Sequence, residues 1–322
     1  MPITQRDVKN RIGSVKNIQK ITRAMEMVAA ARLRRAEQRI EALRPYAAAI
    51  RRMTREAAAA AGNLPRLPIL QEHSEIQTVG ILLIAGDRGL AGAFNSNIVR
   101  AGTSSGRQHE REGRDVVYYA SGRRPASSLT FRGIEPKETF IGFSDRPAYA
   151  NAREIAEKLM AAYIDDEVDR VEVFYNAYES PISQEVRREV LLPLQQATVL
   201  EEGSDEDSDD DGEHDGGEDE QDDGGESRSR QRDSGPSALV EYEPDPEEIL
   251  KRLVPDYVEV SIYRALLEST ASEHGARMTA MRSASDNAST LIDDLTLQMN
   301  RARQAEITQE IMEVVAGAEG LG

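Results

Sequence analysis

Three glycines that follow an apolar run are the first residues of the chain that could do chemistry. Gly86, Gly89 and Gly92 come directly after residues 78–85, and a glycine-rich turn between a strand and a helix can bind a phosphate through backbone amides. Their spacing is GxxGxxG, which is neither the dinucleotide-binding fingerprint GxGxxG nor a P-loop ending in Lys and Ser or Thr. We therefore interpret them as a tight strand-to-helix turn, with a nucleotide site as the weaker alternative.

The other reactive residue types form no recognisable set. The chain has no cysteine, which excludes disulfides, thiolate metal sites and thiol switches. The four histidines have no metal-ligand spacing, and we expect His274 to be a polar residue of a helix seam. They are His73, His109, His214 and His274. We expect no cofactor, no metal and no catalytic site in this chain.

A group of arginines between residues 32 and 39 could contact nucleic acid. Arg32, Arg34, Arg35 and Arg39 have no interleaved aromatic residues, and the rest of the chain is not basic. A solvated helix face, or a contact with an acidic protein, is therefore preferred over nucleic-acid binding.

Most of the net charge lies in one segment. The whole chain carries −17, and residues 201–233 hold 17 acidic residues against three arginines, a local net charge of −14 that leaves −3 for the rest. Residues 201–236 contain almost no apolar side chains that could offset the entropy lost on ordering. We expect an acidic disordered insert, and we hypothesise that its charge modulates the function of the chain.

The chain begins with a long helical pattern. Between residues 1 and 57 there are fourteen Lys or Arg against five acids, and the only glycine is Gly13. Apolar residues recur every three or four positions along one stripe. The stripe consists of Val8, Ile12, Val15, Ile18, Ile21, Met25 and Val28. The pattern predicts an amphipathic helix with a basic outer face.

The middle of the chain has the alternation of an α/β sheet. Apolar runs at 78–85, 115–120 and 171–175 predict strands, and 94–107 and 146–163 predict the helices between them. Residues 184–194 predict a further strand at the edge of the sheet. The middle region is therefore expected to be a separate α/β domain.

The last part of the chain predicts a coiled-coil helix. From Leu267 onward, small and apolar residues follow at spacings of three or four over about five heptads. They are Leu267, Ala271, His274, Met278, Met281, Ser285, Ala288, Ile292, Leu295, Met299 and Ala302. Pro255 is expected either to kink this helix or to mark its start.

The two terminal helices are expected to pair with each other. The N-terminal helix would be about 80 Å long, and the C-terminal helix, counted from Asp256 to Ala316, about 90 Å; both are too long to bury their stripes on so small a middle domain. The predicted fold is a long antiparallel two-helix coiled coil with an inserted Rossmann-like α/β domain. We assign the N-terminal helix to 1–60, the α/β domain to 75–198, the acidic insert to 201–236 and the C-terminal helix to 244–318.

Several stretches resemble the gamma-subunit family of rotary ATP synthases. They cover nearly the whole chain outside the acidic insert and occur in the expected order. They are IQKITRAMEMVAA at 18–30, GDRGLAGAFN at 86–95, ARMTAM at 276–281, ASDNA at 284–288, NRARQAEITQEI at 300–311 and VAG at 315–317.

The resemblance implies functions for particular residues. It places Arg303, Gln304 and Met25 against loops of the surrounding catalytic subunits, and Ile307 and Ile311 in an apolar bearing of the catalytic hexamer. Gly89 and Phe94 would belong to the foot that meets the membrane rotor ring and the epsilon subunit. The acidic insert lies where photosynthetic members of the family carry a regulatory insertion with a cysteine pair, which this chain lacks.

The resemblance implies a central rotor shaft, present once per complex and not itself catalytic. It would couple proton flow to conformational cycling of the alpha and beta subunits. Two alternatives remain: an α/β nucleotide-binding protein with helical arms, which would bind a nucleotide as the isolated chain, and a generic coiled-coil scaffold, which would self-associate. The longest apolar run, residues 79–85, is too short to cross a bilayer, so we expect a peripheral protein at the cytoplasmic face of the cell membrane.

Overall fold

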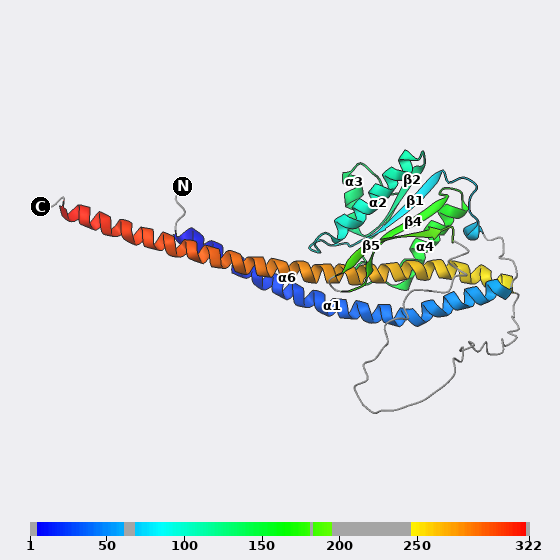
Figure 1. Ribbon diagram of the computed structural model, residues 1–322, viewed down its shortest axis with the longest axis horizontal. Coiled ribbons are helices and arrows are strands. Elements are labelled where there is room, and N and C mark those ends of the chain that lie inside the picture. Colours follow the sequence, from blue (N-terminus) through cyan, green and yellow to red (C-terminus); the bar gives the residue numbers. More distant parts are fainter. Residues whose placement is uncertain (1–4, 61–67, 181–182, 195–245, 320–322) are drawn as a thin grey trace, which may run out of the picture.

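The computed structural model describes residues 5–60, 68–180, 183–194 and 246–319. These residues form a long two-helix rod with a globular α/β domain packed against one part of it (Figure 1). The acidic insert predicted at 201–236 lies outside the described residues.

The rod consists of the first and last helices of the chain. Helix α1 spans Gln5–Ala60 and helix α6 spans Pro246–Glu319, so they are about 84 and 111 Å long. They run antiparallel, because Val8 packs with Leu295 while Leu33 packs with Ala271. The predicted antiparallel coiled coil with an inserted α/β domain is confirmed.

Helix α6 begins earlier than Pro255. It starts at Pro246, where the missing N–H of proline is tolerated in the first turn. Pro255 lies inside the helix, so the alternative in which Pro255 marks the start is wrong.

The predicted seam of α6 is confirmed, but that of α1 is only partly correct. All eleven predicted positions from Leu267 to Ala302 are buried or half-buried, as are Val8, Ile12 and Val15 on α1. Ile18, Ile21 and Val28 are instead 54%, 59% and 53% exposed. The first half of the predicted stripe therefore faces α6, and most of the second half does not.

The reason for the difference is the helical repeat. After Val15 the seam continues through Gln19, Thr22, Glu26 and Ala29, which are buried or half-buried. Alternating steps of four and three keep a seam facing its partner. The apolar stripe instead takes two consecutive steps of three after Val15, so it rotates onto the flank of the helix.

The middle domain is a five-stranded sheet in the order β3-β2-β1-β4-β5. Strands β1 to β4 are parallel, and β5 pairs antiparallel with β4 at the edge. The strands are β1 Thr78–Ile84, β2 Asp115–Ser121, β3 Glu138–Phe140, β4 Arg170–Tyr178 and β5 Gln184–Leu192. The helices are η1 Pro68–Leu70, α2 Phe94–Arg111, α3 Arg123–Phe131 and α4 Tyr149–Ile164.

Both faces of the sheet are covered. Leu82 and Ile84 of β1 share a core with α4 and the start of α6, while Ile81 and Leu83 share a second core with α2 and α3. Buried on both faces, β1 needs a continuous apolar run, which made it predictable. Helix α6 is thus at once half of the rod and one layer of the domain.

The carboxyl edge of the sheet is closed by α6. Ser269 Oγ donates to the carbonyl of Ile84 at the end of β1, 3.3 Å away, and Ser272 Oγ donates to the carbonyls of Asn176 and Ala177 near the end of β4, both at 3.2 Å. In open α/β sheets this edge is where ligands bind. Here a helix of the same chain occupies it.

Besides the single turn η1, the short elements α3 and β3 were not predicted. Helix α3 has nine residues and contains Pro125 and two consecutive serines, and β3 has three residues. Neither is long enough to show a periodicity, and β3 exists because it pairs with β2.

In the described part of the chain, no helix is sufficiently long and apolar to cross a lipid bilayer.

Overpacking the seam should weaken the rod. Ala271 is fully buried against Leu33 and Ala36, so Ala271→Leu should lower the free energy of unfolding by about 1–3 kcal/mol. Ala31→Leu, at an exposed position of α1, is the matched control and should change it by less than about 0.5 kcal/mol. Thermal unfolding followed by circular dichroism compares the two, and equal melting temperatures would contradict the close packing of the helices.

Candidate functional site

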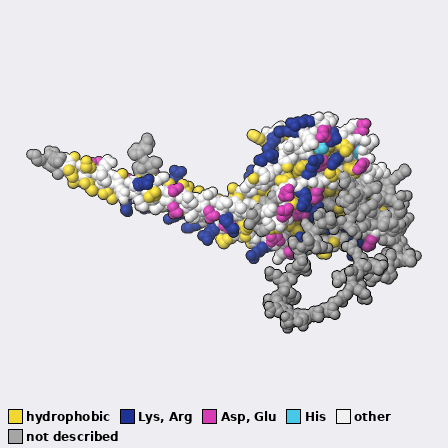
Figure 2. All heavy atoms as spheres, in the orientation of Figure 1, with side chains coloured by type: hydrophobic (Ala, Val, Ile, Leu, Met, Phe, Trp, Pro, Cys, Tyr) yellow, Lys and Arg dark blue, Asp and Glu magenta, His cyan; other side chains and the backbone are white. Residues whose placement is uncertain are grey.

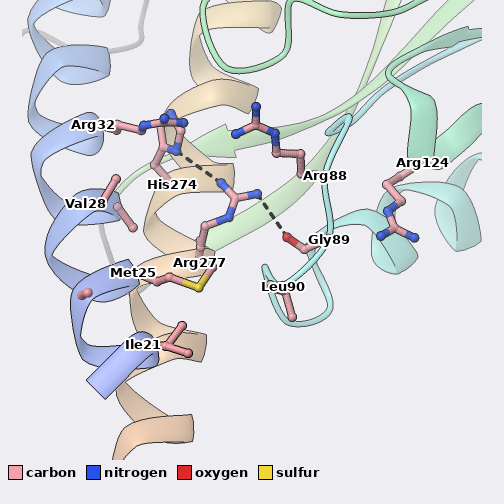
Figure 3. A pocket seen from close by; sticks show the side chains of 12 residues that line it. Ile21, Met25, Val28, Arg32, Arg88, Gly89, Leu90, Arg124, His274 and Arg277 are labelled. Carbon is pink, nitrogen blue, oxygen red and sulfur yellow. Dashed lines mark hydrogen bonds between the residues drawn. The ribbon is translucent and has the colours of Figure 1, made fainter. Parts of the chain in front are cut away.

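A groove lies between the rod and the loop that follows β1. Its volume is about 480 Å³, and α1, α6, the start of α3 and the loop of residues 85–93 contribute its walls (Figure 3). The lining residues are Ile21, Ala24, Met25, Val28, Ala29, Arg32, Arg88, Gly89, Leu90, Arg124, His274 and Arg277. We call it the stalk groove.

One wall of the stalk groove is apolar. It is formed by the rotated stripe of α1, the apolar ridge, which consists of Ile18, Ile21, Met25 and Val28; Ile18 lies just beyond the lining residues. Across the groove, Leu90 is 64% exposed at the tip of the loop (Figure 3). Large apolar side chains gathered on an exposed surface are typical of an interaction site.

The loop of residues 85–93 is held in a fixed turn. The Gly86 N–H donates to Asn95 Oδ1 at 2.9 Å, and the Asp87 N–H donates to Ser144 Oγ at 2.9 Å. Leu90 and Gly92 have positive φ angles of 63° and 54°. The predicted tight turn is confirmed. Because amides at its start already have partners within the chain, the arrangement does not favour the phosphate-loop alternative.

A buried ion pair attaches this loop to α6. Arg277 Nη2 lies 2.5 Å from Glu273 Oε1 and also donates to the Gly89 carbonyl at 3.3 Å. A Cβ atom at Gly86 would lie 2.8 Å from the Glu273 carboxylate, so this close approach requires glycine. Burial raises the pKa of Glu273, and the charge of Arg277 opposes that effect.

His274 lies beside this pair and is neutral near pH 7. It is 1% exposed, and its Nδ1 lies 3.4 Å from Arg277 Nη1 (Figure 3). Burial, followed by the positive charge of Arg277, lowers the pKa of His274 to about 4. The prediction that His274 is a polar seam residue is confirmed by this burial.

Asp145 links α1 to the same loop. Its Oδ2 lies 2.9 Å from Arg32 Nη1 on α1 and 3.0 Å from Arg88 Nη1 on the loop. The groove therefore holds four arginines, including Arg124 and Arg277, whereas the carboxylates paired with them are Asp145 and Glu273. The polar wall carries excess positive charge.

The structure brings together two residues that were predicted for different regions. Met25, expected at a rotor–stator contact, and Gly89, expected at the foot, both line the stalk groove. Phe94 is only 3% exposed and belongs to the core under α2, so its side chain presents little contact surface.

The other predicted contact residues lie far from the groove. Arg303 and Gln304 are exposed on α6, about 40 Å along the helix axis from Arg277. Ile307 and Ile311 are 47% and 57% exposed. No structural contact joins them to the groove, so they form a second, separate surface.

Sequence reasoning missed most of the polar wall. Arg32 was assigned to a solvated face or to a contact with an acidic protein, and Arg88, Arg124, Asp145 and Arg277 were not singled out. Arg32 and Asp145 are 113 positions apart, and nothing local signals that they meet. One local signal was available. After Val15 the next two apolar residues, Ile18 and Ile21, each follow after three positions, and this spacing predicts an apolar ridge that turns away from the seam.

Comparison with known proteins gives a consistent result. A family model described as ATP synthase matches residues 4–321. The ATP synthase gamma chain of Rubrobacter xylanophilus is 39% identical, with 98% of each chain covered, and that of Heliobacterium modesticaldum is 40% identical, with 98% of this chain and 99% of the relative covered.

Solved structures share the fold. A chain from the Tetrahymena thermophila mitochondrial ATP synthase central stalk and ring aligns with a TM-score of 0.55 and 23% identity, over 82% of this chain and 99% of that one. A chain from the Euglena gracilis mitochondrial ATP synthase aligns with a TM-score of 0.62 and 18% identity, over 98% and 94%.

The neutral state of His274 predicts how stability depends on pH. Between pH 6.5 and about 4 the unfolded chain binds a proton at His274 that the folded chain does not, so the free energy of unfolding should fall as the pH falls. The total loss from this residue should be about 3 kcal/mol. His274→Gln should remove it.

Urea unfolding of both proteins from pH 7 to pH 4 measures this loss. Glu273, whose raised pKa acts in the opposite direction, is present in both proteins, so the difference between the curves reports His274. Parallel curves would contradict a buried neutral imidazole.

Proposed function

The chain belongs to the ATP synthase gamma-chain family, and from this premise we propose how it acts as the central rotor shaft of an ATP synthase. It turns inside a hexamer of alpha and beta subunits and couples proton flow through the membrane sector to conformational changes at their catalytic sites. Its other partners are an epsilon subunit and the membrane rotor ring, with one copy of the chain per complex. The family model and the relatives on which this family assignment rests match nearly the whole chain.

The observation that carries the proposal is the overhang of α6. At the described end of α1, the Gln5 N–H donates a hydrogen bond to Glu306 Oε1 at 3.4 Å, and α6 continues from there to Glu319 (Figure 1). Beyond that contact the apolar side chains are exposed, as the yellow spheres at that end show (Figure 2). They are Ile307, Ile311, Met312, Val314 and Val315, between 47% and 72% exposed. A single helix with this surface needs a surrounding apolar partner, which supports a bearing in the hexamer.

The rest of the rod suits rotation against a partner. Lys9, Lys16 and Arg23 follow one another at seven-residue intervals on the flank of α1, all exposed; after Ala30 and Glu37, the same heptad position is again basic and exposed at Arg44 and Arg51. Seven-residue spacing places them on one side of a supercoiled helix. Hydrated, like-charged side chains form weak lateral contacts that can be exchanged as the shaft turns.

Asymmetry gives the rotation its effect. One shaft inside a threefold ring presents a different face to each catalytic subunit, so each orientation favours a different conformation at each site. The bias equals the difference in contact free energy, and about 1.4 kcal/mol shifts such an equilibrium tenfold. A few side-chain contacts that differ between orientations are therefore sufficient to shift the conformation of each catalytic site.

The stalk groove is the second place where such contacts would form. Its apolar ridge and its excess of arginines match a stator loop that carries both apolar and acidic side chains. Met25 and Gly89 would then meet the same loop from opposite walls. In this arrangement Arg303 and Gln304 contact the stator about 40 Å further along the rod.

The chain itself is proposed to be non-catalytic. The carboxyl edge of the sheet, where an α/β enzyme would bind its substrate, is filled by α6 through Ser269 and Ser272. Within the described residues, no group of three or more His, Asp or Glu side chains has the arrangement of a metal site. The proposed location is the cytoplasmic face of the cell membrane, held there through the rotor ring.

Co-purification tests the proposed partners. The full-length chain, tagged and expressed in its native host, should recover from solubilised membranes two ATPase subunits of near-equal size, each in molar excess over the chain. The tag fused to an unrelated soluble protein is the control. Recovery of the chain alone, or of multiples of itself, would favour the coiled-coil scaffold.

Replacing Arg303 and Gln304 together by Ala should lower ATP synthesis by assembled complexes several-fold. Both side chains are exposed and α6 keeps its seam, so the rod should remain folded. Synthesis is measured in inverted membrane vesicles, with Arg100→Ala on the exposed face of α2 as the control. Unchanged synthesis with normal assembly would show that these two contacts are dispensable.

A further inference from the structure

We propose that the stalk groove also binds a small anionic amphiphile, a molecule with an alkyl chain and a carboxylate, sulfate or phosphate head group. Bound there, it would compete with the stator loop and slow rotation. The competition rests on the proposed function, whereas the binding site itself rests only on the geometry of this chain.

The apolar wall supplies the site for the alkyl chain. Ile21, Met25 and Val28 form a continuous strip on α1, and Leu90 faces them from the loop (Figure 3). Three of these four side chains are more than half exposed, so an alkyl chain would remove their apolar surface from water. A volume of about 480 Å³ is within the range of small-molecule sites.

Arg124 supplies the charge for the head group. It is exposed at the start of α3, and its guanidinium has no carboxylate or hydrogen-bond partner among the described residues. It lies over Gly89, because a Cβ atom at that glycine would be 2.8 Å from Arg124 Nη2. A side chain at residue 89 would therefore push the guanidinium away from the groove.

The surroundings of Arg124 strengthen the preference for an anion. Arg32 and Arg88 share a single carboxylate oxygen of Asp145, which leaves donors of both guanidinium groups available. The start of α3 does not add to this preference, because the Arg123 N–H already donates to Asp87 Oδ1 at 2.9 Å and the Arg124 N–H donates to the Gly86 carbonyl at 3.1 Å. Asp145 pairs with Arg32 and Arg88, and Glu273 pairs with Arg277. The third nearby carboxylate, Asp87, accepts hydrogen bonds from backbone amides, so none of the three is paired with Arg124.

The same residues disfavour a nucleotide as the small ligand. No Phe, Tyr or Trp is present among the residues that line the groove, so no aromatic side chain is available to stack on a base. Apart from Arg32, the wall formed by α1 is apolar, which suits an alkyl chain. An anionic amphiphile combines apolar and negatively charged groups, as the proposed stator loop does. Both would occupy the same groove, so binding of one would exclude the other.

Calorimetric titration of the isolated full-length chain tests the site, with decanoate as the probe below its micelle concentration. Decanol, which has the same chain length and no charge, is the ligand control. Arg124→Gln should weaken decanoate binding about tenfold, because it removes a charge-assisted hydrogen bond. Arg132→Gln is the matched protein control: it is an exposed arginine just beyond the other end of α3, outside the groove, and should leave binding unchanged.

Equal binding of decanol, or equal weakening by both substitutions, would overturn the site. Inhibition of ATP hydrolysis in the assembled complex is the second readout, and it should require about ten times more decanoate in the Arg124→Gln complex. If decanoate binds in a charge-dependent way but does not inhibit ATP hydrolysis, its proposed competition with the stator loop is wrong. That result would also count against a stator contact at the groove. The binding site would stand in that case, so the two proposals fail separately.

Discussion

The seam between α1 and α6 is the interaction on which the rest of the structure depends. Two helices of about 84 and 111 Å cannot each bury a stripe on a domain with one five-stranded sheet, so they bury their stripes on each other. Small residues such as Ala36 and Ala271 let the backbones approach closely. Because α6 is also a layer of the α/β domain, the same pairing sets the orientation of the domain on the rod.

The junction between rod and domain uses the edge of the sheet that other α/β proteins use for ligands. Serines of α6 bond to carbonyls at or near the ends of β1 and β4, and the buried Glu273–Arg277 pair holds the following loop against the helix. Polar groups that could have bound a substrate are thereby used to join two parts of one chain. This junction sets both the position and the orientation of the α/β domain on the rod, because the buried hydrogen bonds are satisfied in only one arrangement.

What the rod leaves exposed follows from the same pairing. The seam needs residues in strictly alternating steps of four and three, and the apolar ridge on α1 departs from those steps over residues 18–28. The overhang of α6 exposes a second apolar surface where α1 no longer accompanies it. A shaft that turns within a ring requires surfaces of this type, because contacts that bias a partner must face outward.

The sequence alone determined the architecture: two long helical patterns, an α/β alternation between them, and the regular seam of α6. Periodicity can be read from neighbouring residues alone, and an apolar stripe that continues over five heptads is compatible with few structures other than a coiled-coil helix. The motifs also indicated the family. The stalk groove, in contrast, was decided only by the tertiary structure. Its residues come from positions 21–32, 88–90, 124 and 274–277, and Asp145 joins two of those segments. Contacts between segments so far apart depend on how α6 packs on the sheet, and no local pattern records them.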